Sequence, residues 1–182
     1  MLEIRIHGRG GQGSVVAAQI LATAAFEEGY YGQASLYIVG GGDRRGAPVF
    51  AFCRINKDKI RERTNIYNPD CIIVQDVTLL DTVNVFEGLK PGGIALINTE
   101  RTPEELGIGG INIKTIPASR IAMEMIGAPI TNTTLLGAFS AIMGVISIGA
   151  IKRVILDRFP GSQGQKNAAA AQKTYDFVKE RI

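Results

Sequence analysis

The sequence predicts an α/β fold of the Rossmann-like type: a doubly wound, mostly parallel β-sheet with helices on both faces, built as a single domain over residues 1–182. Three observations predict it. A short alternating strand at the N-terminus runs directly into a glycine cluster and a helix pattern. The run 71–76 is mostly apolar, as is typical of a strand buried in a parallel sheet. Strand patterns alternate repeatedly with helix patterns up to about residue 126.

The predicted elements follow in chain order. In the first strand Leu2, Ile4 and Ile6 alternate with polar residues, and a helix with apolar residues at three- and four-residue spacing opens at Ser14 and stops at Gly29. Further strands are expected at 34–39, 47–55, 71–76, 94–98 and 111–116. Further helices are expected at 78–89, 118–126, 133–146, 152–159 and 162–182.

The glycine cluster is the first candidate site. Gly8, Gly10 and Gly13 fit the pattern G-x-G-x-x-G, which allows a tight turn, close approach of an anion and close packing of helix on strand. Backbone N–H groups at the start of the following helix would face the anion. An ordinary NAD or FAD site also needs an acidic residue about 20 positions further on, and residues 32–39 contain none. A packing turn, a site for another phosphate and a contact with a partner subunit are therefore open alternatives.

A second glycine-rich stretch ends in the paired arginines Arg44 and Arg45. Fixed positive charge beside glycines is typical of anion recognition, although an exposed hairpin loop with solvated charges explains the pattern equally well. Asp76 follows a buried strand, where ligands meet open α/β sheets, or it caps the next helix.

Composition and charge exclude several classes of protein. The net charge of +3, without a basic run interleaved with aromatic residues, does not predict nucleic-acid binding. Cys53 and Cys71 lie in strand patterns and predict buried structural thiols, not a metal or iron–sulfur site. His7 is the only histidine, so the chain is expected to lack most of the groups needed for chemistry of its own.

No signal peptide is expected, because Met1 leads directly into a strand with a charge at position 3, and the predicted location is the cytoplasm. Residues 127–151 carry no charge and are long enough to cross a bilayer. Their proline, glycines and polar residues favour instead a buried helix from about Thr133 to Ile146, capped by Thr131 or Asn132, so no membrane partner is expected.

Small residues define one face of that helix. Gly137, Ala141 and Gly144 share it, which predicts that another helix comes close, and a seam to a partner chain is one place where this would occur.

Taken together, the segments resemble the gamma subunit of the 2-oxoacid:ferredoxin oxidoreductases, the family that includes pyruvate synthase. The resemblance covers nearly the whole chain, and the order and spacing of its motifs are highly specific. The motifs are GRGGQG at 8–13, RRGAPV at 44–49, VQD at 74–76, GLKPGG at 88–93, INT at 97–99, PITNT at 129–133, LGAF at 136–139 and KN at 166–167.

The resemblance implies a complex whose cofactors lie on other subunits. In such enzymes thiamine diphosphate with Mg²⁺ attacks the 2-oxoacid, electrons pass to [4Fe-4S] clusters, and coenzyme A takes the acyl group. The implied partners are alpha, beta and delta-type, ferredoxin-like subunits, with ferredoxin or a flavin/NAD subunit as acceptor. The gamma chain would cover the active site and help to bind coenzyme A. The candidate residues for coenzyme A are Gly8, Arg9, Gly10, Gly11, Gln12, Gly13, Arg44, Arg45 and Asn132.

One departure from the family pattern bears on the substrate. Pyruvate-type gamma chains usually carry an aromatic residue, glycine and glutamate before the paired arginines, whereas residues 39–43 read VGGGD here. Loss of aromatic bulk would leave room for a branched or aromatic 2-oxoacid, such as ketoisovalerate or phenylglyoxylate, although pyruvate stands first. A stand-alone NAD(P)-dependent oxidoreductase and a purely structural subunit are the other functions that the sequence leaves open.

Overall fold

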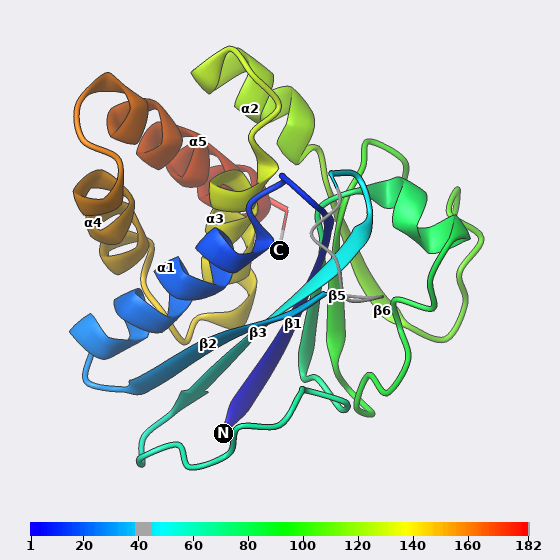
Figure 1. Ribbon diagram of the computed structural model, residues 1–182. Helices are drawn as coiled ribbons and strands as arrows, with labels where there is room; N and C mark the ends of the chain where they lie inside the picture. Colours follow the sequence, from blue (N-terminus) through cyan, green and yellow to red (C-terminus); the bar gives the residue numbers. More distant parts are fainter. Residues whose placement is uncertain (39–44, 182) are drawn as a thin grey trace.

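The computed structural model describes residues 1–38 and 45–181. These described residues form a six-stranded sheet, five α-helices and one short 3₁₀ helix (Figure 1). In chain order the elements are β1 Leu2–Arg9, α1 Ser14–Glu27, β2 Tyr31–Ile38, β3 Pro48–Asn56, β4 Cys71–Val74, η1 Val77–Asp81, β5 Ile94–Asn98, β6 Asn112–Ile116, α2 Ala118–Ile126, α3 Thr131–Met143, α4 Ile148–Arg158 and α5 Ser162–Lys179.

The sheet has the order β2-β3-β1-β4-β5-β6. Neighbouring strands from β1 through β4 and β5 to β6 are parallel, whereas β3 is antiparallel to both β1 and β2. Helix α1 connects β1 to β2, and β3 lies between these two strands in the sheet. Strand β3 is the antiparallel strand of the described sheet. The predicted mostly parallel α/β sheet in a single domain is confirmed.

The two faces of the sheet are covered differently. Helices α1, α3, α4 and α5 gather on one side (Figure 1), where alternate strand residues such as Ile4, Ile6 and Ile73 join the larger core. The strand residues of opposite parity, including Ile72 and Val74, pack under η1 and irregular chain. The expected second helical layer is therefore a thin cover with one turn of 3₁₀ helix, not a set of α-helices.

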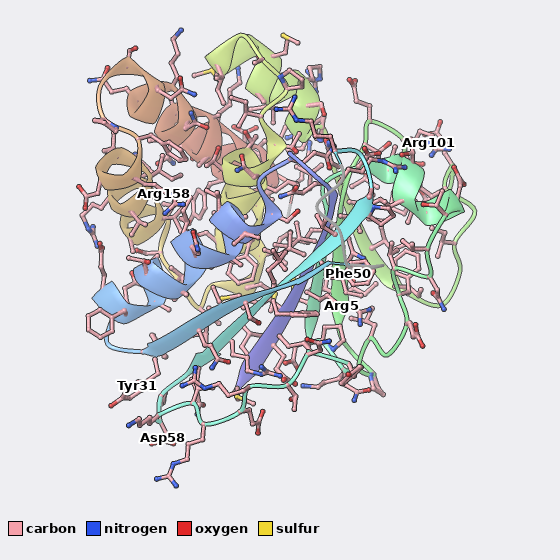
Figure 2. All side chains as sticks on the ribbon, in the orientation of Figure 1. Arg5, Tyr31, Phe50, Asp58, Arg101 and Arg158 are labelled. Atoms are coloured by element: carbon pink, nitrogen blue, oxygen red, sulfur yellow. The ribbon has the colours of Figure 1, made fainter. Side chains whose placement is uncertain are left out.

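A buried arginine fastens this cover to the sheet. The Arg5 guanidinium donates hydrogen bonds to the carbonyl oxygens of Val85 at 3.1 Å and Glu87 at 2.5 Å, and its Nε donates to His7 Nε2 at 2.9 Å. Arg5 and Phe50 lie close together on this face (Figure 2), where both line a cavity of about 390 Å³. Burial, followed by the nearby Arg5 charge, lowers the pKa of His7 to about 3, so the imidazole is neutral.

Two sequence predictions about helices are wrong. The helix expected at 78–89 exists only as η1, followed by turns, because β-branched and turn-forming residues favour local hydrogen bonds there over a continuous helix. Helix α3 begins at Thr131 with Ile130 as its N-cap and no side-chain cap, so neither Thr131 nor Asn132 caps it. The strand at 94–98 and the helix at 118–126 are confirmed with the expected bounds.

The small-residue face of α3 meets another helix of the same chain. A Cβ placed on Gly137 would lie 1.9 Å from the carbonyl oxygen of Ala171 in α5. The close approach is confirmed, but the partner at Gly137 is α5, not a second chain. Within the described residues no single helix is long and apolar enough to cross a bilayer, and α2 and α3 reach that composition only as a pair bent by 119°.

Candidate functional site

The glycine bend lies at the carboxyl end of β1 and leads into α1. Gly11 and Gly13 have positive φ angles of 94° and 75°, which favour glycine. A Cβ on Gly8 would lie 2.3 Å from Ser14 Oγ, and one on Gly13 would lie 2.3 Å from Asn132 Nδ2. Backbone conformation and close packing thus explain three of the glycines.

Most backbone donors of the bend bind protein atoms. The Arg9 N–H donates to Gln12 Oε1 at 2.7 Å, and the Gln12 N–H donates to the Arg9 carbonyl at 3.0 Å. The Gly10 N–H donates to the Ala47 carbonyl at 2.8 Å. Three of the four N–H groups between Arg9 and Gln12 are therefore engaged. The first N–H groups of α1 are different, because a helix start has no intrahelical acceptors and no side chain in the described residues caps α1.

Asp76 holds the bend from the neighbouring strand end. Its carboxylate accepts hydrogen bonds from Arg9 Nε at 3.2 Å, Gln12 Nε2 at 3.1 Å, and the hydroxyl and N–H of Thr78 at 2.6 and 3.0 Å. Partial burial acts to raise the pKa of Asp76, but these hydrogen bonds and the Arg9 charge outweigh it and lower the pKa. Asp76 is also the N-cap of η1, so it has the capping role that the sequence offered as an alternative.

The chain directly after Arg45 contacts the bend through the backbone of Gly46. The N–H of Gly46 donates to the Gly10 carbonyl at 3.1 Å, and the Gly46 carbonyl accepts from Arg9 Nη1 at 3.1 Å. Arg45, one residue earlier, is exposed beside this junction. Arg44 lies outside the described residues, as do residues 39–43 on which the substrate prediction depends. A cavity of about 280 Å³ on this side is lined by the bend, the start of α1 and Leu36.

Asn132 is buried and joins two helices. Its Nδ2 donates to the Gly13 carbonyl at 3.3 Å, at the start of α1. The side chain thus packs α3 against the end of the bend. The structure therefore brings Asn132, residues 8–13 and the backbone beside Arg45 to the same edge of the sheet.

A cleft of about 380 Å³ opens on the other side of Gln12, outside the carboxyl ends of β4 and β5. Ligands of open α/β sheets bind at such a position. The polar residues Gln75, Asn98 and Ser119 line the cleft and were not among the predicted site residues, although Gln75 and Asn98 lie in motifs of the family resemblance. The signal available was a polar residue at the carboxyl end of a buried strand: Gln75 directly follows β4, and Asn98 is the last residue of β5.

The described residues contain no group of three or more His, Cys, Asp and Glu residues that could hold a metal ion. Cys53 and Cys71 are free, buried thiols, which confirms the structural prediction. Burial raises the pKa of Cys53 to about 12 and raises that of Cys71 further, so both are protonated at neutral pH.

These features define a class of protein, the Rossmann-like α/β domain with candidate binding groups at the carboxyl ends of its parallel strands. In this domain the carboxylate of Asp76 holds the glycine bend. The comparisons give the family. A family model described as pyruvate ferredoxin/flavodoxin oxidoreductase matches residues 3–177, and the chain belongs to this family.

The sequences of individual relatives align with this chain over essentially its full length. Pyruvate synthase subunit PorC of Methanocaldococcus jannaschii is 52% identical over 181 residues, covering 100% of this chain and 99% of the relative. The pyruvate/ketoisovalerate oxidoreductases common subunit gamma of Thermococcus litoralis is 49% identical over 180 residues, covering 97% and 96%. The crystal structure of pyruvate oxidoreductase subunit PORC from Thermotoga maritima has a TM-score of 0.84 and 37% identity, covering 96% of this chain and 95% of that one. The predicted resemblance to gamma subunits is confirmed.

Proposed function

We propose that this chain is the gamma subunit of a thiamine diphosphate and iron–sulfur dependent 2-oxoacid:acceptor oxidoreductase, in which it covers the active site and binds coenzyme A. The complex would convert a 2-oxoacid and coenzyme A to acyl-CoA and CO₂ and pass two electrons to ferredoxin or to a flavin/NAD subunit. Family membership supports the complex. The observation that supports the role of this chain is the start of α1, which no described side chain caps and which follows a bend whose Gly10 binds Gly46, the residue after the exposed Arg45.

The chemistry belongs to groups on the partner subunits. Thiamine diphosphate with Mg²⁺ and [4Fe-4S] clusters would supply decarboxylation and electron transfer when bound by alpha, beta and delta-type chains. In the described part of this chain, the two thiols are buried and protonated and no acidic cluster could hold a metal ion. These residues do not fit such cofactors, so the proposed contribution of this chain is binding and the exclusion of water.

Phosphate groups would meet the chain at the start of α1. The N–H groups of its first turn, led by Ser14, are oriented outward along the helix axis, and the helix dipole adds positive potential. Arg45, one residue before the hydrogen bond between Gly46 and Gly10, would add a full positive charge. Arg9 is not proposed as a phosphate ligand, because its guanidinium already binds Asp76, Thr78 and Gly46.

The substrate proposed first is pyruvate, which appears in the names of both relatives given above. Ketoisovalerate, named for the Thermococcus litoralis subunit, supports a branched 2-oxoacid as the next candidate. An aromatic 2-oxoacid such as phenylglyoxylate follows. The purified complex, assayed with a panel of 2-oxoacids, coenzyme A and a viologen dye, would rank them.

The test of coenzyme A binding is Arg45→Ala in the complete complex. Loss of one exposed charge-assisted contact should raise the KM for coenzyme A about fivefold and leave the KM for the 2-oxoacid nearly unchanged. Arg61→Ala is the matched control, because Arg61 is also exposed but lies in the loop at the opposite edge of the sheet. An unchanged KM for coenzyme A in Arg45→Ala would remove Arg45 from the site.

A further inference from the structure

The cleft beside Gln12 contains a buried amide with an unmet hydrogen bond. Gln75, at the end of β4, is 2% exposed and lines the cleft. Its Nε2 has no hydrogen-bond partner in the part of the chain that the structure describes. Buried polar groups are nearly always paired, so this amide is available to a polar group of a ligand, or to a water molecule, that enters the cleft.

The surroundings hold Gln75 in place. The Ser14 hydroxyl lies 3.1 Å from its Oε1, its backbone N–H donates to the His7 carbonyl at 2.9 Å, and its carbonyl accepts from Asn98 Nδ2 at 2.8 Å. Ser14 can pair with only one end of the side-chain amide. Whichever way that amide is turned, its second polar atom lacks a partner, as a donor in one orientation and as an acceptor in the other.

The charges that line the cleft are balanced in pairs. Asp76 is paired with Arg9 at 3.2 Å, and Glu100 is paired with Arg120 at 3.5 Å. The cleft therefore lacks the excess positive charge that Arg45 provides on the other side of the bend. An uncharged group with both donors and acceptors fits it better than a phosphate does.

The lining also disfavours a nucleobase. None of the described residues that line the cleft carries an aromatic ring, and stacking on aromatic side chains is the usual way in which proteins hold a base. Its apolar contacts come from Val77, Pro117 and Pro129, which suit a slender chain.

We infer that the cleft binds the amide-bearing pantetheine arm of coenzyme A, with one amide of the arm hydrogen-bonded to the side chain of Gln75. This inference rests on the proposed function. Gln12 lines the cleft, whereas Gly10 and Gly11 line the cavity on the side of Arg45. A ligand with its phosphates at the start of α1 thus reaches the cleft by crossing the bend at Gln12.

The experiment compares two ligands on the purified complex under anaerobic conditions. Isothermal titration calorimetry gives the Kd of coenzyme A and of 3′-phosphoadenosine 5′-diphosphate, which carries the nucleotide but lacks the arm. Gln75→Met, which keeps the length of the side chain and removes both polar atoms, should raise the Kd of coenzyme A about tenfold. The Kd of the truncated ligand should change less than twofold.

Two further variants guard against a general loss of structure. Ser140→Ala removes another buried hydrogen bond, from its hydroxyl to the Ile146 carbonyl at 2.8 Å, and should leave both Kd values unchanged. Thr99→Phe places a bulky ring in the cleft lining and should reproduce the selective loss if Gln75→Met does not assemble.

An equal loss for both ligands would place the nucleotide in the cleft and overturn the inference. No loss for either ligand, in Gln75→Met or in Thr99→Phe, would overturn it as well. Arg45→Ala in the same assay keeps the two proposals separate, because it should weaken both ligands. A selective effect of Gln75→Met with no effect of Arg45→Ala would support the arm and refute the phosphate position.

Discussion

The contact between α3 and α5 allows the sharpest test of the packing. A Cβ on Gly137 would lie 1.9 Å from the carbonyl oxygen of Ala171 and 3.0 Å from the backbone nitrogen of Tyr175. Both are backbone atoms of α5, so no side chain can turn aside to make room. Gly137→Ala must therefore push the two helices apart in the larger core.

The expected size of the effect combines two opposing terms. Overpacking a core costs about 1–3 kcal/mol or more, and alanine recovers up to about 1 kcal/mol of helix propensity over glycine. The free energy of unfolding should therefore fall by about 2 kcal/mol. Gly149→Ala, in the first turn of α4, is the matched control. The nearest atoms to its added Cβ are side-chain ends at 3.6 Å, so it should raise the free energy of unfolding by about 0.5 kcal/mol.

The assay is urea unfolding of the isolated chain followed by circular dichroism at 222 nm. The two alanine variants should shift the midpoint in opposite directions with similar slopes. If Gly137→Ala were as stable as the parent chain, α3 and α5 could not be as close as the structure places them.

Two pH-dependent predictions follow from the same assay. The pKa of His7 is lowered to about 3, so the unfolded chain binds the additional proton, and the free energy of unfolding should fall by up to about 1.4 kcal/mol per unit as the pH drops from 6.5 toward 3. His7→Gln should flatten this slope, and an equally steep slope would contradict the burial of a neutral imidazole. The pKa of Asp76 is lowered as well, so its contribution is complete above the ordinary carboxyl value and is lost as the pH falls through the native pKa. Asp76→Asn should reduce the free energy of unfolding at pH 7 by about 1 kcal/mol and remove this dependence on pH. A variant as stable as the parent would show that the ion pair with Arg9 contributes no stability.

Sequence reasoning located most of the fold because local patterns were consistent with the tertiary structure. The alternating pattern identified β1, an apolar run identified β4, and Gly29 was placed correctly just after the end of α1. The position of β3 could not be read in this way, because an inserted antiparallel strand has the same local pattern as a neighbouring parallel one. The helix predicted after Asp76 was wrong for a related reason. The apolar residues of this segment pack on the sheet from η1 and turns, and this packing needs no continuous helix.

Sequence reasoning chose residues that the structure brings close together, but it did not predict the contacts among them. The bend follows the carboxyl end of β1, the backbone beside Arg45 reaches it because the antiparallel β3 begins there, and Asn132 reaches it from α3. The use of the bend's N–H groups by Gln12 and Ala47 depends on contacts that no spacing rule encodes. The same holds for Gln75, whose unmet amide becomes visible only when Ser14 is placed beside it.

The bend also shows why G-x-G-x-x-G need not indicate a dinucleotide. In a nucleotide-binding turn the glycines let a phosphate approach the backbone, and the ligand supplies the negative charge. Here Asp76 supplies that charge from the adjacent strand, and Arg9 and Gln12 bind it. Because the bend already holds a carboxylate of its own chain, a second anion there would meet repulsion and few unused donors. An external phosphate is better placed one step along the chain, where the start of α1 and Arg45 carry positive charge that no described carboxylate balances.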